Sequence, residues 1–93
     1  MNKTELIAAT ARAAGITQKD SERVLNIMLR IMTETLAQGE KVQLSGFGTF
    51  DTRYREAYTA RNLRTREVVE VPAAKVPTFK AGTALREAME KKE

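Results

Sequence analysis

Cysteine, histidine and tryptophan are absent from the 93-residue sequence, and proline occurs only twice. Without cysteine, the chain can form no disulfide and offers no thiolate to a metal ion. Without histidine, it lacks the usual general base, the usual zinc ligand and the partner of a catalytic serine or cysteine. The sequence also has no glycine-rich phosphate loop. These absences argue against an enzyme, a cofactor, a metal site and a small-molecule substrate.

Long apolar runs are also missing. A membrane helix needs about 18 consecutive apolar residues, and no segment approaches this. The N-terminus, Met1–Glu5, resembles no signal peptide, so we expect a cytoplasmic protein without membrane contact. A 10.4 kDa chain is one small domain with a thin core, for which oligomerisation is a natural supplement.

The positive charge is concentrated in one segment. The chain carries a formal charge of +4, and residues 53–66 hold five arginines against one acid, Glu56. The eleven basic and eleven acidic residues elsewhere cancel. Because a guanidinium presents a rigid fork of donors suited to phosphates, a balanced body with a cationic projection favours a polyanionic partner.

Capping signals predict two N-terminal helices. Asn2 followed by Glu5 resembles a capping box, and Gly15 suits a helix C-terminus, which predicts a helix over 3–14. Thr17 is the expected N-cap of a second helix, which ends at Gly39.

The second helix has an unusually wide apolar face. At about 100° per residue its apolar side chains cover an arc of roughly 200°, whereas a helix on one core needs little more than 100°. We interpret the excess as a homodimer interface; the alternative is a helix wrapped by its own small domain. The apolar residues are Val24, Leu25, Ile27, Met28, Leu29, Ile31, Met32 and Leu36.

After Gly39 the pattern changes to strands. Residues 41–44 alternate, Ser45-Gly46 suits a tight turn, and a second strand is predicted from Phe47 through Tyr58. Val68–Val71 mark a third strand that returns from an arm, with Pro72 and Pro77 interrupting its regularity as at an edge or bulge. A short helix follows over 83–91. The remaining candidates for core or dimer interface are Leu44, Phe47, Phe50 and Phe79.

Several segments resemble the HU family of bacterial histone-like DNA-binding proteins. They are Met1–Ile7, Lys41–Phe50, Arg61-Asn62 and Pro72–Lys80, and the resemblance covers essentially the whole chain, closer to HU than to integration host factor. It implies an α+β fold and an intertwined homodimer, although a heterodimer with a paralogue stays open. The expected body has two N-terminal helices and a short C-terminal helix, and a three-stranded antiparallel sheet extends into β-ribbon arms. The expected parts are 1–39 for helical dimerisation, 40–82 for the sheet with its arm at about 53–75, and 83–93 for the last helix.

The resemblance further implies that the arms enter the minor groove of double-stranded DNA and bend it without sequence specificity, as a nucleoid-associated architectural protein. Arm cations would neutralise phosphates and release counterions. The candidate DNA contacts are Lys3, Arg53, Arg55, Arg61, Asn62, Leu63, Arg64, Thr65, Arg66, Lys75, Lys80 and Arg86.

The arm tip departs from the family pattern Arg-Asn-Pro-x-Thr-Gly. Leu63 replaces the proline that wedges between base pairs, and Arg66 replaces the turn glycine. Leucine is a known wedge residue, so the two alternatives are a Leu63 that intercalates and a tip that merely tracks the groove. Arginine disfavours a turn that requires positive φ. Tyr58 stands where a basic residue is common, and we interpret it as a structural cross-strand aromatic.

Two other functions fit the same charge pattern. The arms of a dimeric interaction module could dock on an acidic protein, or the chain could be an RNA-binding relative. Arms shaped for B-form DNA should fit A-form RNA poorly because its minor groove is wide and shallow.

Overall fold

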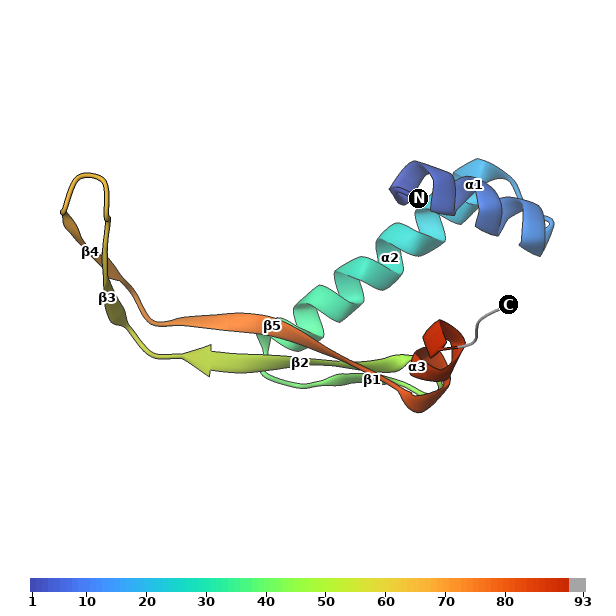
Figure 1. Ribbon diagram of the computed structural model, residues 1–93. Helices are drawn as coiled ribbons and strands as arrows, with labels where there is room; N and C mark the ends of the chain where they lie inside the picture. The colour runs from blue at the N-terminus through green and yellow to red at the C-terminus, as the bar shows by residue number, and fades with distance from the viewer. Residues whose placement is uncertain (91–93) are drawn as a thin grey trace. The chain divides into compact units, whose positions relative to one another are not determined.

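The computed structural model describes residues 1–90, which form three helices and five strands (Figure 1). The chain divides into two compact units, residues 1–34 and 35–93. The first unit holds α1 and most of α2, and the second holds the end of α2, the strands and α3. In chain order the elements are α1 (Lys3–Ala14), α2 (Gln18–Ala37), β1 (Val42–Leu44), β2 (Gly48–Arg55), β3 (Tyr58–Arg61), β4 (Val68–Val71), β5 (Ala74–Ala81) and α3 (Thr83–Glu90).

Both ends of α1 are formed by the predicted caps. The Oδ1 of Asn2 accepts from the backbone N–H of Glu5 at 2.8 Å, and the Asn2 N–H donates to Glu5 Oε1 at 3.1 Å. This reciprocal pair satisfies two donors that the first turn cannot use, and an N-cap typically contributes about 1 kcal/mol. At the other end Gly15 has φ 71°, and its N–H donates to the carbonyl of Ala11.

The second helix begins where its cap predicted. The Oγ1 of Thr17 accepts from the N–H of Asp20 at 3.0 Å. The helix ends at Ala37, two residues before Gly39, which has φ 86°. The buried Ser21 hydroxyl donates to the carbonyl of Ile7 at 2.9 Å, which joins α1 to α2 by a bond withdrawn from water.

The wide apolar face of α2 is largely uncovered in this chain. Among residues 1–90 the buried hydrophobic side chains are Ile7 and Ala11 alone, whereas Val24 is 52% exposed and Met28 50%. Part of this face opens on a groove of about 330 Å³. Its lining residues are Leu6, Thr10, Ala14, Ile16, Ser21, Val24, Leu25 and Met28. The helix therefore does not find its apolar partner within its own unit.

The second unit contains an antiparallel sheet in the order β1-β2-β5. A tight turn joins β1 to β2, with Gly46 at φ 82° and the Phe47 N–H donating to the carbonyl of Leu44 at 2.9 Å. Gly48 is required by space, because an added Cβ would lie 2.5 Å from Phe79 Cε1 and 2.7 Å from the Lys80 carbonyl oxygen.

An aromatic cluster lies on this sheet. The ring of Phe79 lies 4.7 Å from that of Phe50 and 5.6 Å from that of Phe47 between centroids. Phe47 and Phe79 are nevertheless 46% and 44% exposed, and Leu44 is also exposed. They are therefore not enclosed within this chain, and their place in a dimer interface stays a prediction. The Oγ1 of Thr52 donates to the carbonyl of Leu36 at 2.8 Å and ties β2 to the end of α2.

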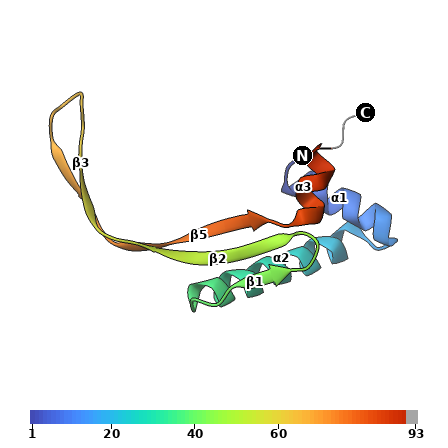
Figure 2. The ribbon, with the colours of Figure 1, turned by 60° about the horizontal axis from the view of Figure 1, so that its bottom comes forward.

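Beyond the three-stranded sheet the chain forms a two-stranded ribbon of β3 and β4 (Figure 2). Tyr58 lies opposite Val71 and Arg61 opposite Val68. The predicted α+β fold, with a three-stranded sheet extended into a β-ribbon arm, is thus confirmed.

Two details of the strand prediction were wrong. The second strand does not run unbroken to Tyr58, because Glu56 and Ala57 interrupt it. The returning segment, predicted as one strand with its regularity interrupted at Pro72 and Pro77, forms two strands that are separated at Pro72 and Ala73, and Pro77 lies inside β5. Since β5 pairs only with β2 within residues 1–90, it is an edge strand, which tolerates proline. The last helix is described to Glu90, so its predicted continuation over 91–93 lies outside the described residues.

Candidate nucleic-acid interface

The candidate contact residues lie on several elements. Lys3 is in α1 of the first unit, and all the others are in the second. Arg53 and Arg55 lie in β2, Arg61 ends β3, and residues 62–66 form the loop at the arm tip. Lys75 and Lys80 lie in β5, and Arg86 in α3. Apart from Arg55, which is half-buried, all of these residues are exposed.

The strand register sorts the cations of the sheet by face. Residues directly opposite in an antiparallel pair share a face, and neighbours along a strand alternate between faces. Arg53 lies opposite Val76, and Lys80 opposite Thr49, so Arg53 and Lys80 lie on the same face. Lys75 lies opposite Tyr54, on the other face, which also carries Phe50 and Phe79. The sheet therefore does not gather all its predicted contacts on one side.

Among the residues that the structure describes, four of the five arm arginines have no partner for their guanidinium groups. Within residues 1–90, an ion pair forms only between the Met1 amine and Glu5, 3.8 Å apart. The side chains of Arg53, Arg61, Arg64 and Arg66 make no hydrogen bond in the same part of the chain. Their guanidinium groups are therefore available to an external anion without first breaking an internal contact.

Arg55 is the exception among the arm arginines. Its Nη2 donates to the carbonyl of Pro72 at 3.4 Å, and its guanidinium carbon lies 5.7 Å from the centre of the Tyr58 ring. The sequence assigned Arg55 to DNA contact together with its neighbours, with no signal that separates it from Arg53.

The tip loop is organised by Asn62. Its Oδ1 accepts from the N–H of Arg64 at 2.9 Å and from that of Thr65 at 3.4 Å. Its backbone N–H donates to the carbonyl of Glu67 at 2.9 Å, which closes the hairpin. An asparagine side chain that binds backbone groups two and three residues on is a turn former. Sequence reasoning assigned Asn62 to DNA contact and missed this structural role.

Arg66 adopts the conformation that its side chain disfavours. Its φ is 61°, and it is the non-glycine residue with positive φ among those described. A left-handed conformation costs roughly 1–2 kcal/mol for an L-residue with a Cβ. The Arg66 N–H donates to the Asn62 carbonyl at 2.6 Å, so the loop holds the glycine-like turn although the glycine has been replaced.

Leu63 projects from this loop. The side chain is 88% exposed, although a leucine that found internal packing would be buried. Because Asn62 fixes the backbone beside it, Leu63 is an apolar side chain presented at the end of a cationic ribbon.

The described residues contain no group of three or more acidic side chains placed to hold a metal ion. In the same part of the chain no helix has the length and apolar character needed to cross a membrane.

Comparisons with known proteins identify related chains over nearly the whole length. A family model described as bacterial DNA-binding protein matches residues 1–90. A DNA-binding protein HU of Lactococcus lactis is 52% identical over 88 residues, which are 95% of this chain and 97% of the relative. One of Clostridium pasteurianum is 48% identical over 98% of this chain and 100% of the relative. Among solved structures, a cocrystal of Anabaena HU with DNA has a TM-score of 0.89 and 43% identity, covering 97% of this chain and 98% of that one.

Asn62→Ala removes the acceptor for two backbone N–H groups, each worth about 0.5–1.5 kcal/mol. We expect amide hydrogen exchange at Arg64 and Thr65 to quicken by about three- to tenfold, measured by NMR in the free protein. Asn62→Asp keeps an acceptor at the same place and should exchange like the parent. Equal exchange in Asn62→Ala and the parent would contradict the role of Asn62.

Proposed function

This chain belongs to the bacterial DNA-binding protein family, and from that premise we propose that it is a nucleoid-associated architectural protein, not an enzyme. It binds double-stranded DNA without sequence specificity and bends it, acting in the cytoplasm on the nucleoid. Its partners are duplex DNA and a second copy of this chain.

The observation that carries the proposal is the set of partner-free guanidinium groups on the arm. Arg53, Arg61, Arg64 and Arg66 are exposed and meet no carboxylate within residues 1–90. Neutralising phosphates with such groups releases condensed counterions, which gives affinity without reading sequence. Arginine also suits a narrow minor groove, where the negative potential is deepest. Lys3, Lys80 and Arg86 add phosphate contacts from the body, and Lys75 and Thr65 complete the set.

We assign the DNA wedge to Leu63. Minor-groove architectural proteins, of which HU is an established example, insert apolar side chains between base steps and kink the duplex. Leu63 is presented for this at the arm tip, 88% exposed and beside a backbone held by Asn62. Flexible pyrimidine–purine steps, nicks and gaps should be preferred because they are easier to deform.

A second copy of the chain supplies the missing cover for α2. Val24, Met28 and Ile31 are each at least half exposed on one helix, although burying such side chains contributes about 1.5–3 kcal/mol each. The interface also takes Ile27 and Met32 of the helix, and Leu44, Phe47, Phe50 and Phe79 of the sheet. Dimerisation places two arms on one duplex.

The test of DNA binding is fluorescence anisotropy of a random-sequence duplex at several salt concentrations. The affinity should fall steeply with log salt. Arg61→Ala should weaken binding to all sequences alike and reduce the salt slope by about one for each arm, because one phosphate contact is lost. Arg12→Ala removes the same charge from α1, outside the proposed surface, and should leave the slope unchanged.

Competition between duplex DNA and duplex RNA, together with DNA binding at low salt, distinguishes DNA from the two alternative partners. Duplex RNA that competed as well as duplex DNA would favour the RNA-binding alternative. Absence of DNA binding even at low salt would overturn the proposal and favour an acidic protein partner. A loss confined to one sequence in Arg61→Ala would contradict non-specific binding.

The wedge is tested by bending. We expect Leu63→Ala to reduce the energy transfer between dyes at the two ends of a bound duplex, because alanine is too short to hold a base step open. Leu63→Met keeps a long apolar side chain and should bend DNA like the parent. If the alanine variant bends DNA as strongly at saturation, Leu63 is not a wedge.

The dimer is tested on α2. Met28→Glu places a charge on the apolar face and should shift the sedimentation-equilibrium mass toward that of the monomer. Asn26→Glu introduces the same charge on the polar side of the helix and should leave the dimer intact. A parent chain that sediments as a monomer at micromolar concentration would refute the interface.

A further inference from the structure

The ribbon is interrupted on both strands at the same level. β2 ends at Arg55 and β3 begins at Tyr58, while β4 ends at Val71 and β5 begins at Ala74. Two residues are thus skipped on each side, and the ladder resumes in register, from the pair Arg55–Ala74 to the pair Tyr58–Val71. We call residues 55–58 and 71–74 the elbow. In both ribbon views the chain changes direction here (Figures 1 and 2).

A contact between Arg55 and Tyr58 shows how the chain turns between β2 and β3. In a continuous strand, residues three apart point to opposite faces of the sheet. Arg55 and Tyr58 are three apart, yet the guanidinium carbon of Arg55 lies over the Tyr58 ring, 5.7 Å from its centre. The interruption at Glu56 and Ala57 has therefore brought the two side chains to the same side. The cation–π contact thus spans the interruption of the strand.

The same guanidinium also reaches the opposite strand. Its Nη2 donates to the carbonyl of Pro72 at 3.4 Å, at the interruption of the returning chain. Its Nε is buried and has no hydrogen-bond partner among the described residues. Arg55 thus contacts both strands of the elbow and is half-buried, whereas Arg53 is exposed.

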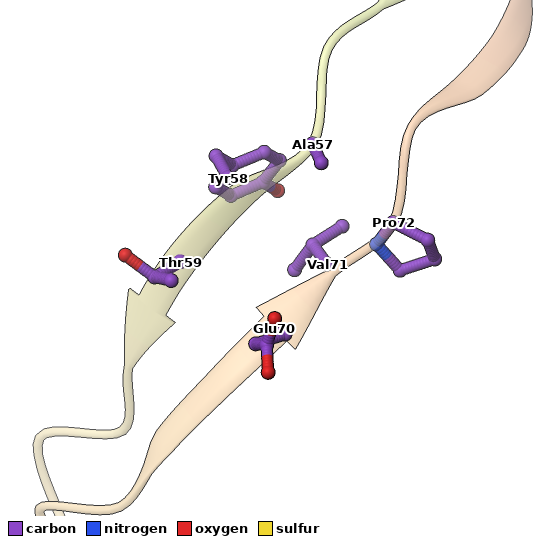
Figure 3. Close-up of a pocket in the computed structure, with 6 residues that line it drawn as sticks. All are labelled: Ala57, Tyr58, Thr59, Glu70, Val71 and Pro72. Carbon is purple, nitrogen blue, oxygen red and sulfur yellow. The ribbon is translucent and has the colours of Figure 1, made fainter.

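The packing around the elbow is otherwise open. Figure 3 shows Tyr58 and Thr59 on one strand, with Glu70 and Val71 on the other, around a pocket of about 500 Å³. A two-stranded ribbon has no core beneath it, so few contacts fix its direction relative to the three-stranded sheet. Each contact that bridges the interruption therefore contributes a larger share of that restraint.

We propose that Arg55 is a positioning residue that sets the direction of the arm through Tyr58 and Pro72, and that it is not a phosphate ligand. The proposal replaces the DNA contact that the sequence suggested for Arg55. Tyr58, which the sequence suggested as a structural cross-strand aromatic, has the further role of holding the Arg55 guanidinium over its ring. Only the consequence for DNA binding rests on the proposed function; the contact itself orders the free protein.

The absence of native cysteine makes a direct measurement simple. Spin labels on Gln43→Cys in β1 and Thr59→Cys in β3 span the elbow. Dilution with unlabelled chain isolates the distance within one chain. We expect Tyr58→Leu and Arg55→Gln to broaden the distance distribution in the free protein. Tyr58→Phe keeps the aromatic face and should restore the narrow parent distribution. Equal widths for Tyr58→Leu and the parent would overturn the proposal.

DNA binding supplies the second readout. We expect Arg55→Gln and Tyr58→Leu to weaken duplex binding by about three- to tenfold with the parent salt slope, since no phosphate contact is lost. Arg53→Gln, the matched neighbour in β2, should reduce the slope by about one for each arm. An equal reduction of the slope in Arg55→Gln would show a phosphate ligand instead. A parent that binds no DNA would defeat the proposed function, whereas the label distances would still decide the elbow.

Discussion

The pairing of β2 with β5 is the interaction on which the rest of the second unit depends. Eight residues of each strand pair without a gap, from Gly48 opposite Ala81 to Arg55 opposite Ala74. At one end the ladder includes Phe50 and Phe79, whose rings contact each other at a tilt of 40°, and at the other it ends at the elbow. A ribbon beyond a sheet buries little of its own apolar surface, so its order comes from this ladder and from local contacts. At Gly48 the ring of Phe79 and the carbonyl of Lys80 come so close to the backbone that there is no room for a Cβ, so the ladder packs tightly against the aromatic cluster.

The arm tip shows how a chain can keep a backbone conformation after losing the residue that favours it. Arg66 occupies a left-handed conformation that glycine adopts without cost. The hydrogen bonds that Asn62 makes offset that cost: its Oδ1 accepts from two backbone N–H groups, its carbonyl accepts from the Arg66 N–H, and its own N–H donates to Glu67. The replacement adds a guanidinium to the tip loop, where no carboxylate pairs with it within residues 1–90. The backbone strain at Arg66 thus coincides with a positive charge at the arm tip, where the proposed DNA contact lies.

Much of the fold could be predicted because the signals were local. Asn2, Gly15 and Thr17 act on backbone groups within four residues, so their sequence pattern specifies the helix ends. The elbow could not be predicted, because nothing in Glu56-Ala57 marks a break. The break is recognised only when both strands are seen to skip two residues together. On the returning strand Pro72 and Pro77 signalled an edge or bulge, but proline alone does not tell that the ladder breaks at Pro72 and continues through Pro77. For the site, composition identified the cationic arm, but only the contacts separate Arg55 and Asn62 from their neighbours.

The lack of internal hydrogen bonds at the arm arginines also explains why DNA binding should be independent of base sequence. A base is read by a side chain that meets its edge in a bidentate geometry, and each such pair discriminates by about 1–3 kcal/mol. Arg53, Arg61, Arg64 and Arg66 have no internal hydrogen bond that could hold them so within residues 1–90. Exposed guanidinium groups without such a hold can contact phosphates and follow groove width but enforce no single base. The internal contacts of the arm lie at the backbone of the tip and at the elbow, and these set where Leu63 and the charges are placed. Selectivity therefore falls to the ease with which the duplex deforms.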